Sequence, residues 1–301
     1  MLRIGLVDLC TSHPGSFVPI LRQMGKVEVA AVYDSGAARP DGYAAQFAAE
    51  HGIPAACERL EDMPALVDAA IVHSADWDNH LDRARPFIEA GKPVWIDKPI
   101  VGNLRDLNEL LNLEAKHGTL IMGGSSLRWA VEVRELRERL AERGEVVSAF
   151  FSGPGDFFNY GIHTVEMMGG LLGAGIRSVA WVASHGGTDV FHAAYGDGRI
   201  ALFQLGSPHH QWQMTVTTTG GVETATVDAG KLYEALLRTY LGAIAAGEAP
   251  LPLRDVLDSI KVALAAKVSR RTRQPVFLDE LTDEERFDGH AFNAEYARGR
   301  R

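Results

Sequence analysis

Lys98 and His163 are the side chains of this sequence whose types and surroundings best suit chemistry. Lys98 ends the apolar run of "VWIDKPI" and precedes a proline, and His163 begins an apolar stretch in "FNYGIHTVEMM". The ordinary alternatives are a solvated surface lysine and a hydrogen-bonded core histidine. An imidazole, however, has an ordinary pKa near neutral pH and can give or take a proton. The two residue types therefore suit a reaction in which a proton is transferred and charge on a substrate oxygen is stabilised.

The elements expected to position Lys98 alternate between strands and helices. Apolar runs typical of buried parallel strands alternate with segments of helical spacing, several of which end at a glycine. The expected strands are 2–7, 27–33, 69–73, 94–96 and 120–122, and the expected helices are 17–24, 43–51, 80–90 and 104–117. This alternation predicts right-handed crossovers and a parallel sheet. Ligands bind such sheets at the carboxyl ends of the strands, which gathers residues 8–15, 34, 74–79 and 97–99 around one crevice.

The rest of the chain has a different pattern. Period-two alternation predicts strands at 146–152, 179–184, 190–195, 200–205, 212–218 and 222–227, with an Asp-Gly hairpin signal in "YGDGR". Helical spacing predicts helices at 131–143, 160–172, 231–246 and 253–271, and the polar tail from Thr282 is expected to be an arm or a late helix. We therefore expect an α/β chain with a parallel-sheet domain at 1–122 and an α+β domain at 123–301. The second domain is expected to contain a large, mainly antiparallel open sheet, substrate contacts and the oligomer interface.

Composition narrows the classes of partner. The chain has 301 residues, 46% hydrophobic and 23% charged, with a formal net charge of -9. No basic stripe is present, so we do not expect a nucleic-acid partner. Two cysteines make no disulfide framework. The N-terminus enters a strand without a signal-peptide pattern, and no apolar run is long enough to span a membrane. We therefore expect a cytoplasmic protein with no membrane partner.

The opening loop, "IGLVDLCTSHPGS", resembles a dinucleotide-binding turn that has lost most of its glycines. Asp8 stands at the first glycine position and Cys10 at the second, and the next glycine is Gly15. An aspartate beside a pyrophosphate is repulsive unless it turns away. The hydroxyls and imidazole of the loop, together with the helix N-terminus, are expected to offset the lost contacts. The alternative is a plain strand-to-helix connection in a fold that has lost its cofactor. The expected cofactor contacts here are Cys10, Thr11, Ser12 and His13.

Asp34, at the end of the second strand, favours NAD over NADP. An acid at this place hydrogen-bonds a ribose 2′-hydroxyl and repels a 2′-phosphate. Ser35 follows it and joins the expected contacts. The alternative is a turn aspartate before "SG", because Asp and Ser are common turn residues.

Three segments together resemble the glucose–fructose oxidoreductase, inositol dehydrogenase and rhizopine-catabolism (Gfo/Idh/MocA) family. The run "NHLDRARPFIEAGKPVWIDKPI" is similar to the family's helix, strand and Glu-Lys-Pro, with Asp97 in place of Glu. The run "FNYGIHTVEMM" is similar to its Asp-x-Gly-x-His helix entry, with Asn159 in place of Asp. The segment from Tyr233 to Leu278 resembles its C-terminal helix pair and closing strand. The resemblance covers nearly the whole chain and implies a Rossmann-type first domain and NAD(P)-dependent oxidoreductase activity.

The resemblance also implies the catalytic residues. Lys98 and His163 would lie beside the nicotinamide and the reacting carbon, with Lys98 on the substrate oxygen and His163 as acid or base. Asn159 cannot take up a proton at neutral pH. Either His163 carries the proton alone, or the substrate is not a simple polyol, or the redox activity is weakened. Asn159 could instead be only the N-cap of the following helix.

The remaining expected contacts follow the third and fifth strands. Ser74, Trp77, His80 and Asp97 are expected along the cofactor, although His80 at a helix start favours a structural role. Arg128, Trp129, Asn159 and Tyr160 are expected to line the substrate, although the first two could simply bridge the domains. Adjacent residues of a strand point opposite ways, so His209 and His210 are not expected to bind a metal, and no metal site is expected.

The sequence thus predicts an NAD-dependent dehydrogenase acting on a sugar, cyclitol or related polyhydroxylated compound. One alternative uses the same redox pair transiently, for elimination or epimerisation with cofactor recycling. Another is a cofactor-free relative that binds a small ligand. Apolar residues on both alternating sets of the later strands predict a homodimer or homotetramer, with Trp212 or Phe203 near the subunit contact.

Overall fold

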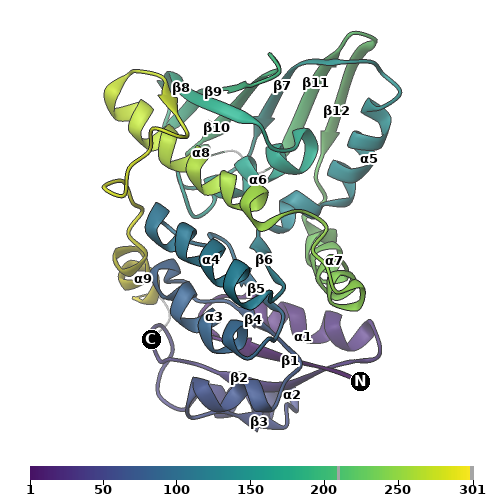
Figure 1. Cartoon of the computed structure of the whole chain (residues 1–301), viewed down its shortest axis with the longest axis vertical. Coiled ribbons are helices and arrows are strands. Elements are labelled where there is room, and N and C mark those ends of the chain that lie inside the picture. The colour runs from purple at the N-terminus through teal and green to yellow at the C-terminus, as the bar shows by residue number, and fades with distance from the viewer. Residues whose placement is uncertain (209–210, 299–301) are drawn as a thin grey trace. The chain divides into compact units, whose positions relative to one another are not determined.

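The computed structural model describes residues 1–208 and 211–298 and divides into two units (Figure 1). The first unit contains Met1–Gly123, Leu237–Leu253 and the described residues from Asp288 on. The second contains Gly124–Leu236 and Arg254–Phe287. The first change of unit lies within two residues of the boundary expected from the sequence. The chain then returns to the first unit twice, which the local pattern does not reveal because helical spacing carries no information about the sheet that a helix packs on. No helix within the two described stretches is long and apolar enough to cross a membrane.

The first unit is built on a six-stranded sheet in the order β3-β2-β1-β4-β5-β6. Its strands are β1 (Leu2–Val7), β2 (Val27–Tyr33), β3 (Ala55–Ala56), β4 (Ala69–Val72), β5 (Val94–Asp97) and β6 (Ile121–Gly124). β1 pairs in parallel with β2 and with β4, and β4 pairs in parallel with β5. All residues of β4 and β5 are buried, as continuous apolar strands covered on both faces should be. The parallel sheet is confirmed, and its carboxyl-terminal edge carries the loops expected to face a ligand.

The helices of this unit begin and end mostly where local signals place them. They are α1 (His13–Gln23), α2 (Tyr43–His51), α3 (His80–Glu89) and α4 (Leu104–His117), with short 3-10 turns at Leu60–Ala65 and Trp77–Asn79. Gly52 and Gly118 end α2 and α4 in the left-handed region, at φ of 58° and 61°. The sequence predicted that α1 starts at 17, but it starts at His13. A proline in the first turn does not stop a helix, because its missing N–H would have no partner there.

Two later helices complete the first unit. In α7 (Leu232–Ala246), the buried Tyr240 ring meets the edge of Trp95 at 5.8 Å. Its hydroxyl lies 2.9 Å from the carbonyl oxygens of both Ala70 and Pro93. The short α9 (Gly289–Ala297), at the yellow end of the chain in Figure 1, is the late helix that the sequence left open.

The second unit is built on a seven-stranded sheet in the order β12-β11-β7-β10-β9-β8-β13. Its strands are β7 (Val146–Ser152), β8 (Ile176–His185), β9 (Thr188–Tyr195), β10 (Ile200–Leu205), β11 (Gln213–Thr218), β12 (Gly221–Thr226) and β13 (Val276–Phe277). The Asp-Gly turn joins β9 and β10 as an antiparallel hairpin, as predicted. β10 and β7 pair in parallel, and the other pairs are antiparallel. The mainly antiparallel sheet is therefore confirmed.

The helices of this unit are α5 (Val131–Leu140), α6 (Gly161–Leu172) and α8 (Leu253–Thr272), with 3-10 turns at Ser126–Trp129 and Ala229–Lys231. α6 packs against β7 and β10, and α5 against β12. The side chains of Phe151, Phe191 and Phe203 are fully buried, and they alternate with half-buried outer residues.

The two residues expected near a subunit contact differ in their surroundings. Phe203 is 0% exposed and stacks on Phe191 at 5.3 Å inside the unit. Trp212 meets the edge of His163 at 5.6 Å and closely approaches Gly153. Phe203 therefore lies on the covered face of the sheet, because alternation shows which residues share a face but not which face the protein's own helices cover. Trp212 is half-buried, and its expected place near a subunit contact stays a prediction.

Candidate functional site

Asp34 lies where β1 and β2 end side by side. One carboxylate oxygen accepts a hydrogen bond from the backbone N–H of Leu9 at 2.7 Å, and the other accepts from that of Gly36 at 2.9 Å. Partial burial raises the pKa of Asp34, while the two amide bonds oppose this change. The carboxylate is thus fixed in direction and stays half-exposed. Each oxygen keeps a second lone pair with which it can accept from a ligand hydroxyl.

Asp8, the aspartate at the first glycine position of the opening loop, is turned away from the surface of the loop. It takes up φ of 58°, the left-handed conformation for which a glycine is normally used and which Asp tolerates. Its side chain is fully buried and turns toward the β2 side, where it accepts from the N–H of Ser35 at 2.9 Å and from Nε of Arg83 at 3.2 Å. The negative charge is thus paired, and it points into the protein.

The other residues of the loop lead directly into α1. Cys10 is 1% exposed, and its Sγ accepts from the N–H of Ala75 at 3.3 Å. Burial, helped by the charge of Asp8, raises the pKa of this thiol to about 12. Thr11 accepts from the N–H of His13 at 3.2 Å, and Ser12 is the exposed N-cap. The first turn of a helix offers unpaired amide groups, which favour an anion.

His13 turns away from this loop toward Asp97 at the end of β5. One oxygen of Asp97 is hydrogen-bonded to Nδ1 of His13 and lies 3.5 Å from Nδ1 of the buried His73, and the other accepts from the N–H of Lys98 at 2.8 Å. Burial alone would raise the pKa of Asp97, but the two imidazoles hold it well below its usual range. Burial lowers the pKa of His73. Asp97 therefore fixes the backbone from which the Lys98 side chain projects.

The side chains of the loop after β4 that were expected along the cofactor are buried and bonded within the protein. Both ring nitrogens of the buried His80 face carbonyl oxygens, Ile100 O at 2.9 Å and Ser74 O at 2.8 Å. Ser74 accepts from the N–H of Asp76, and Trp77 is 3% exposed. These side chains hold the loops after β4 and β5 together, so the structural reading of His80 is the one that the geometry supports.

The helix α9 covers this loop and part of the opening loop. Phe292 packs on Trp77 with ring centres 4.9 Å apart, and the N–H of Gly289 donates to Asp78 at 2.9 Å. A Cβ at Gly289 would lie 2.6 Å from a carboxylate oxygen of Asp76, so only glycine fits there. At the other end of the helix, Ala297 joins a buried cluster with Cys10, Ala38 and Ala75.

Two groups of side chains in this unit have the composition of a metal site, which the sequence did not indicate. The first group is His13, His73 and Asp97, and the second is Asp76, Asp78 and His290. Within each group the potential ligand atoms lie within 4.8 Å of one another. In the first group Asp97 already pairs with both histidines, and in the second Asp76 pairs with His290. The hydrogen bond and charge of Asp76 raise the pKa of His290. The pair of histidines at 209 and 210 lies outside the described residues.

His163, in the second unit, is held by a residue that the sequence analysis missed. Its Nδ1 lies 2.5 Å from Oγ of Ser125, and that oxygen also accepts from the N–H of Leu127 at 3.0 Å. The rings of Tyr160 and Trp212 meet the imidazole edge-on at 5.7 and 5.6 Å. The ring is 8% exposed, and its direction is fixed through Nδ1. The signal in the sequence was slight: "GGSS" follows the strand β6, at the same end of the sheet as Lys98.

Arg128 is buried and held by an ion pair. Its Nε is 2.5 Å from Oε2 of Glu166, whose other oxygen accepts from Ser259 at 2.7 Å, and both charged side chains are buried. Burial raises the pKa of Glu166, although the guanidinium opposes this change. The pair therefore joins the turn at 126–129 to α6, and Trp129, beside it, is half-buried. The ion pair gives Arg128 a structural role, and its expected substrate contact stays a prediction.

Asn159 and Tyr160 precede α6, and Asn159 is not the N-cap. The α6 cap position is Tyr160, and the carboxylate of Asp156 accepts from the N–H groups of Phe158 and Tyr160 at 2.9 and 3.3 Å. The capping alternative for Asn159 is therefore wrong, because Tyr160 occupies the cap position and Asn159 precedes it. Tyr160 is 44% exposed, so its side chain is open to a ligand.

Comparison with known proteins shows a family that the first part of the chain resembles. Residues 11–125 match the model of the Gfo/Idh/MocA oxidoreductases, described as an oxidoreductase family with an NAD-binding Rossmann fold. This N-terminal part of the chain is therefore similar to that family. The protein YceM of Salmonella typhimurium is 31% identical over 139 residues, which are 46% of this chain and 43% of that protein. The scyllo-inositol 2-dehydrogenase (NADP(+)) IolU of Bacillus subtilis is 28% identical over 121 residues, 40% of this chain and 35% of that one. The chain therefore spans less than half the length of the curated relatives it matches.

A solved structure extends the likeness of fold to nearly the whole chain. The scyllo-inositol dehydrogenase of Lactobacillus casei, crystallised with NAD(H) and scyllo-inositol, superposes with a TM-score of 0.82 at 15% identity. The match covers 93% of this chain and 100% of that one. At this identity the likeness shows the fold, and the chemistry must be argued from the residues themselves.

The packing of α9 makes a prediction about the two cysteines. In the intact chain, N-ethylmaleimide at pH 7.5 should label the half-buried Cys57 well before the buried Cys10. Replacing Phe292→Ala removes the ring that packs on Trp77 and should loosen α9, so labelling of Cys10 should become about tenfold faster. Mass spectrometry of the peptides measures both rates.

The exposed Phe277→Ala is the control and should leave both labelling rates unchanged. Equal labelling of the two cysteines in the intact chain, or no change at Cys10 with Phe292→Ala, would show that α9 does not cover the loop.

Proposed function

We propose that this protein is an NAD-dependent dehydrogenase acting on a hydroxyl or carbonyl group of a sugar, cyclitol or related polyhydroxylated compound. One observation carries the proposal. The half-exposed carboxylate of Asp34, oriented by two backbone amides, and the start of α1, with its unpaired amides, lie at the same edge of a parallel sheet. The names of the relatives support the substrate class, since they include inositol dehydrogenases.

The residues present fit a dinucleotide at this edge. Asp34 would accept from the ribose hydroxyls, and the first turn of α1 would face the pyrophosphate through its amides. Asp8 is turned inward and paired with Arg83, which removes the repulsion that its position in the loop would cause. Thr11, Ser12 and Ser35 would complete the contacts. NAD, when bound, supplies the acceptor for the hydride of the carbinol carbon.

In the proposed reaction the substrate hydroxyl loses one proton, and its carbon loses one hydride. We assign the proton to His163, whose ring is oriented through Nδ1 by Ser125, which leaves the chemistry to Nε2. Lys98 would hold the substrate oxygen and stabilise negative charge on it, from a backbone fixed by Asp97. Asn159, as an amide, would orient a substrate hydroxyl without taking a proton, so His163 alone moves the proton.

One observation favours a second function. α9 packs on the loop that carries Cys10 and on the loop that carries Ala38, beside Asp34. If this helix keeps the dinucleotide out, the chain is a cofactor-free relative that binds a small polyhydroxylated ligand. This alternative would be established if the protein gave no enhancement of NADH fluorescence at any NADH concentration and still bound a cyclitol.

The cofactor assignment predicts a preference that depends on Asp34. The unaltered protein should bind NAD more tightly than NADP. Asp34→Ala removes both the ribose contact and the repulsion of a 2′-phosphate, so the ratio of the two affinities should fall by about tenfold or more. Titration calorimetry with each dinucleotide measures the ratio.

Asp41→Ala, an exposed acid in the same loop, is the matched control and should keep the preference. Equal affinities for NAD and NADP in the unaltered protein would sink the assignment of Asp34.

The catalytic assignment predicts the effects of three variants on NADH production from a panel of inositols and sugars. Lys98→Met and His163→Ala should each lower kcat by about a hundredfold or more, while NAD affinity stays near its original value. Ser125→Ala should lower kcat by a smaller factor and move the pH profile, because it frees the imidazole without removing it. The neighbouring Ser126→Ala is the control. Full activity of either of the first two variants would remove that residue from the mechanism.

We also propose that the protein forms a homodimer or homotetramer through the outer face of the seven-stranded sheet. Phe150, Val190 and Leu202 lie half-buried on that face, opposite the residues that pack on α6. Light scattering at micromolar concentration should give at least a dimer mass, and Leu202→Asp should reduce it to one chain. A monomeric mass for the unaltered protein would refute the interface.

A further inference from the structure

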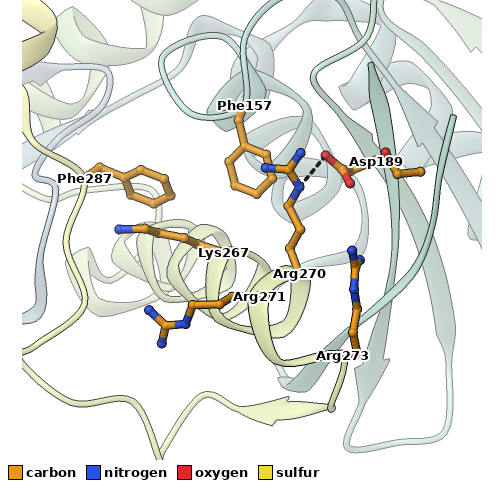
Figure 2. A pocket seen from close by; sticks show the side chains of 8 residues that line it. Phe157, Asp189, Lys267, Arg270, Arg271, Arg273 and Phe287 are labelled. Atoms are coloured by element: carbon orange, nitrogen blue, oxygen red, sulfur yellow. Dashed lines mark ion pairs between the residues drawn. The ribbon is translucent and has the colours of Figure 1, made fainter. Parts of the chain in front are cut away.

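The second unit contains a cavity of about 560 Å³ whose wall carries four basic side chains. Lys267, Arg270 and Arg271 come from the last turns of α8, and Arg273 follows the end of the helix. Asp189 is the one carboxylate among the lining residues described. Figure 2 shows Arg270 reaching from the helix to Asp189, with Arg273 rising beside it and Lys267 lying next to Phe287.

Acidic partners neutralise only part of this charge. Asp189 is 2% exposed and uses one oxygen to accept from Nε1 of Trp181 and the other to pair with Arg270 at 2.9 Å. Arg271 pairs with Glu285. Lys267 donates to a backbone carbonyl, and Arg273 lies 3.6 Å from the ring centre of Trp181. Within the described part of the chain, neither side chain forms an ion pair with a carboxylate. Four cations and two carboxylates leave an excess of two positive charges in a chain whose net charge is -9.

Aromatic rings fix the directions of these cations. Arg270 lies 5.6 Å from the ring centre of Phe157, and Lys267 lies 5.1 Å from that of Phe287. Phe287 is itself stacked on Phe158 at 3.7 Å. The electron-rich face of an aromatic ring attracts a cation, so the rings help to hold both charged groups at the wall of the cavity. The cavity therefore has a charged side and two apolar walls, which suits a ligand with an anionic group and a flat body.

The ordinary explanation for basic residues here is the helix dipole, which favours cations in the last turn. That explanation covers Arg270 and Arg271 but not Arg273, which lies beyond the helix at φ of 62° and stacks on β8. It also does not explain why a buried carboxylate and three aromatic rings orient these side chains around one space.

We propose that this cavity binds a small molecule carrying a diphosphate or similarly charged phosphoryl group. Guanidinium groups match phosphate oxygens with paired hydrogen bonds, and a lysine adds a compact charge. The volume is within the range of small-molecule sites, about 300–1,000 Å³. All the residues belong to the second unit, so the proposal does not depend on whether the first unit binds NAD.

Titration calorimetry of inorganic pyrophosphate into the full chain, without added dinucleotide, tests the site. Variants of the cavity residues separate this site from the start of α1, because they alter only the second unit. Lys267→Gln and Arg273→Gln should each weaken binding by about fivefold to tenfold, and the double variant by about thirtyfold or more. Raising the salt concentration should weaken binding further.

Arg254→Gln is the matched control, because it lies at the start of the same helix with its side chain 76% exposed. It should change the affinity by less than about twofold. Thermal unfolding of each variant confirms that it folds. The proposal is overturned if pyrophosphate gives no binding heat, if binding is unchanged in the double variant, or if Arg254→Gln weakens it as much as the other substitutions do.

Discussion

Two carboxylates at the ends of β1 and β2 hold the surface on which the proposed function depends. Asp34 binds the amides of Leu9 and Gly36, and Asp8 binds the amide of Ser35 in return. Each charge thus fixes the loop that follows the other strand. Side chains take over work that glycines do in other dinucleotide turns, because Asp8 accepts the left-handed conformation and Arg83 neutralises it. These hydrogen bonds therefore fix the direction in which the start of α1 faces a ligand.

A second constraint comes from the end of the chain. The nine residues of α9 are too few for a helix that is stable alone, which needs about 12 or more residues. The helix therefore depends on its packing against Trp77 and Cys10 and on the bonds of its N-terminus to Asp78. A short helix that depends on a few packing contacts is among the first segments of a protein to unfold locally. The same packing that buries the Cys10 thiol thus sets how easily the opening loop can be reached.

Much of the fold followed from the sequence, because buried parallel strands and glycine-ended helices leave local signals. The Lys-Pro and Gly-x-His segments pointed to the residues that the structure fixes at the end of β5 and the start of α6. The sequence did not reveal the tertiary contacts between residues far apart in the chain. Ser125 and His163 are 38 residues apart, and no periodicity links them. Arg128 looked like a ligand contact because its partner Glu166 lies on another element, and Phe203 looked exposed because alternation does not show which face is covered.

The central claim is that the edge of the sheet at β1 and β2 receives a dinucleotide. Hydrogen exchange of the backbone amides, measured with and without saturating NAD, tests it most directly. The account predicts slower exchange at residues 9–16 and 34–38 when NAD is added, with the amides of α5 (Val131–Leu140) unchanged. Unchanged exchange at residues 9–16 and 34–38 in saturating NAD would contradict it.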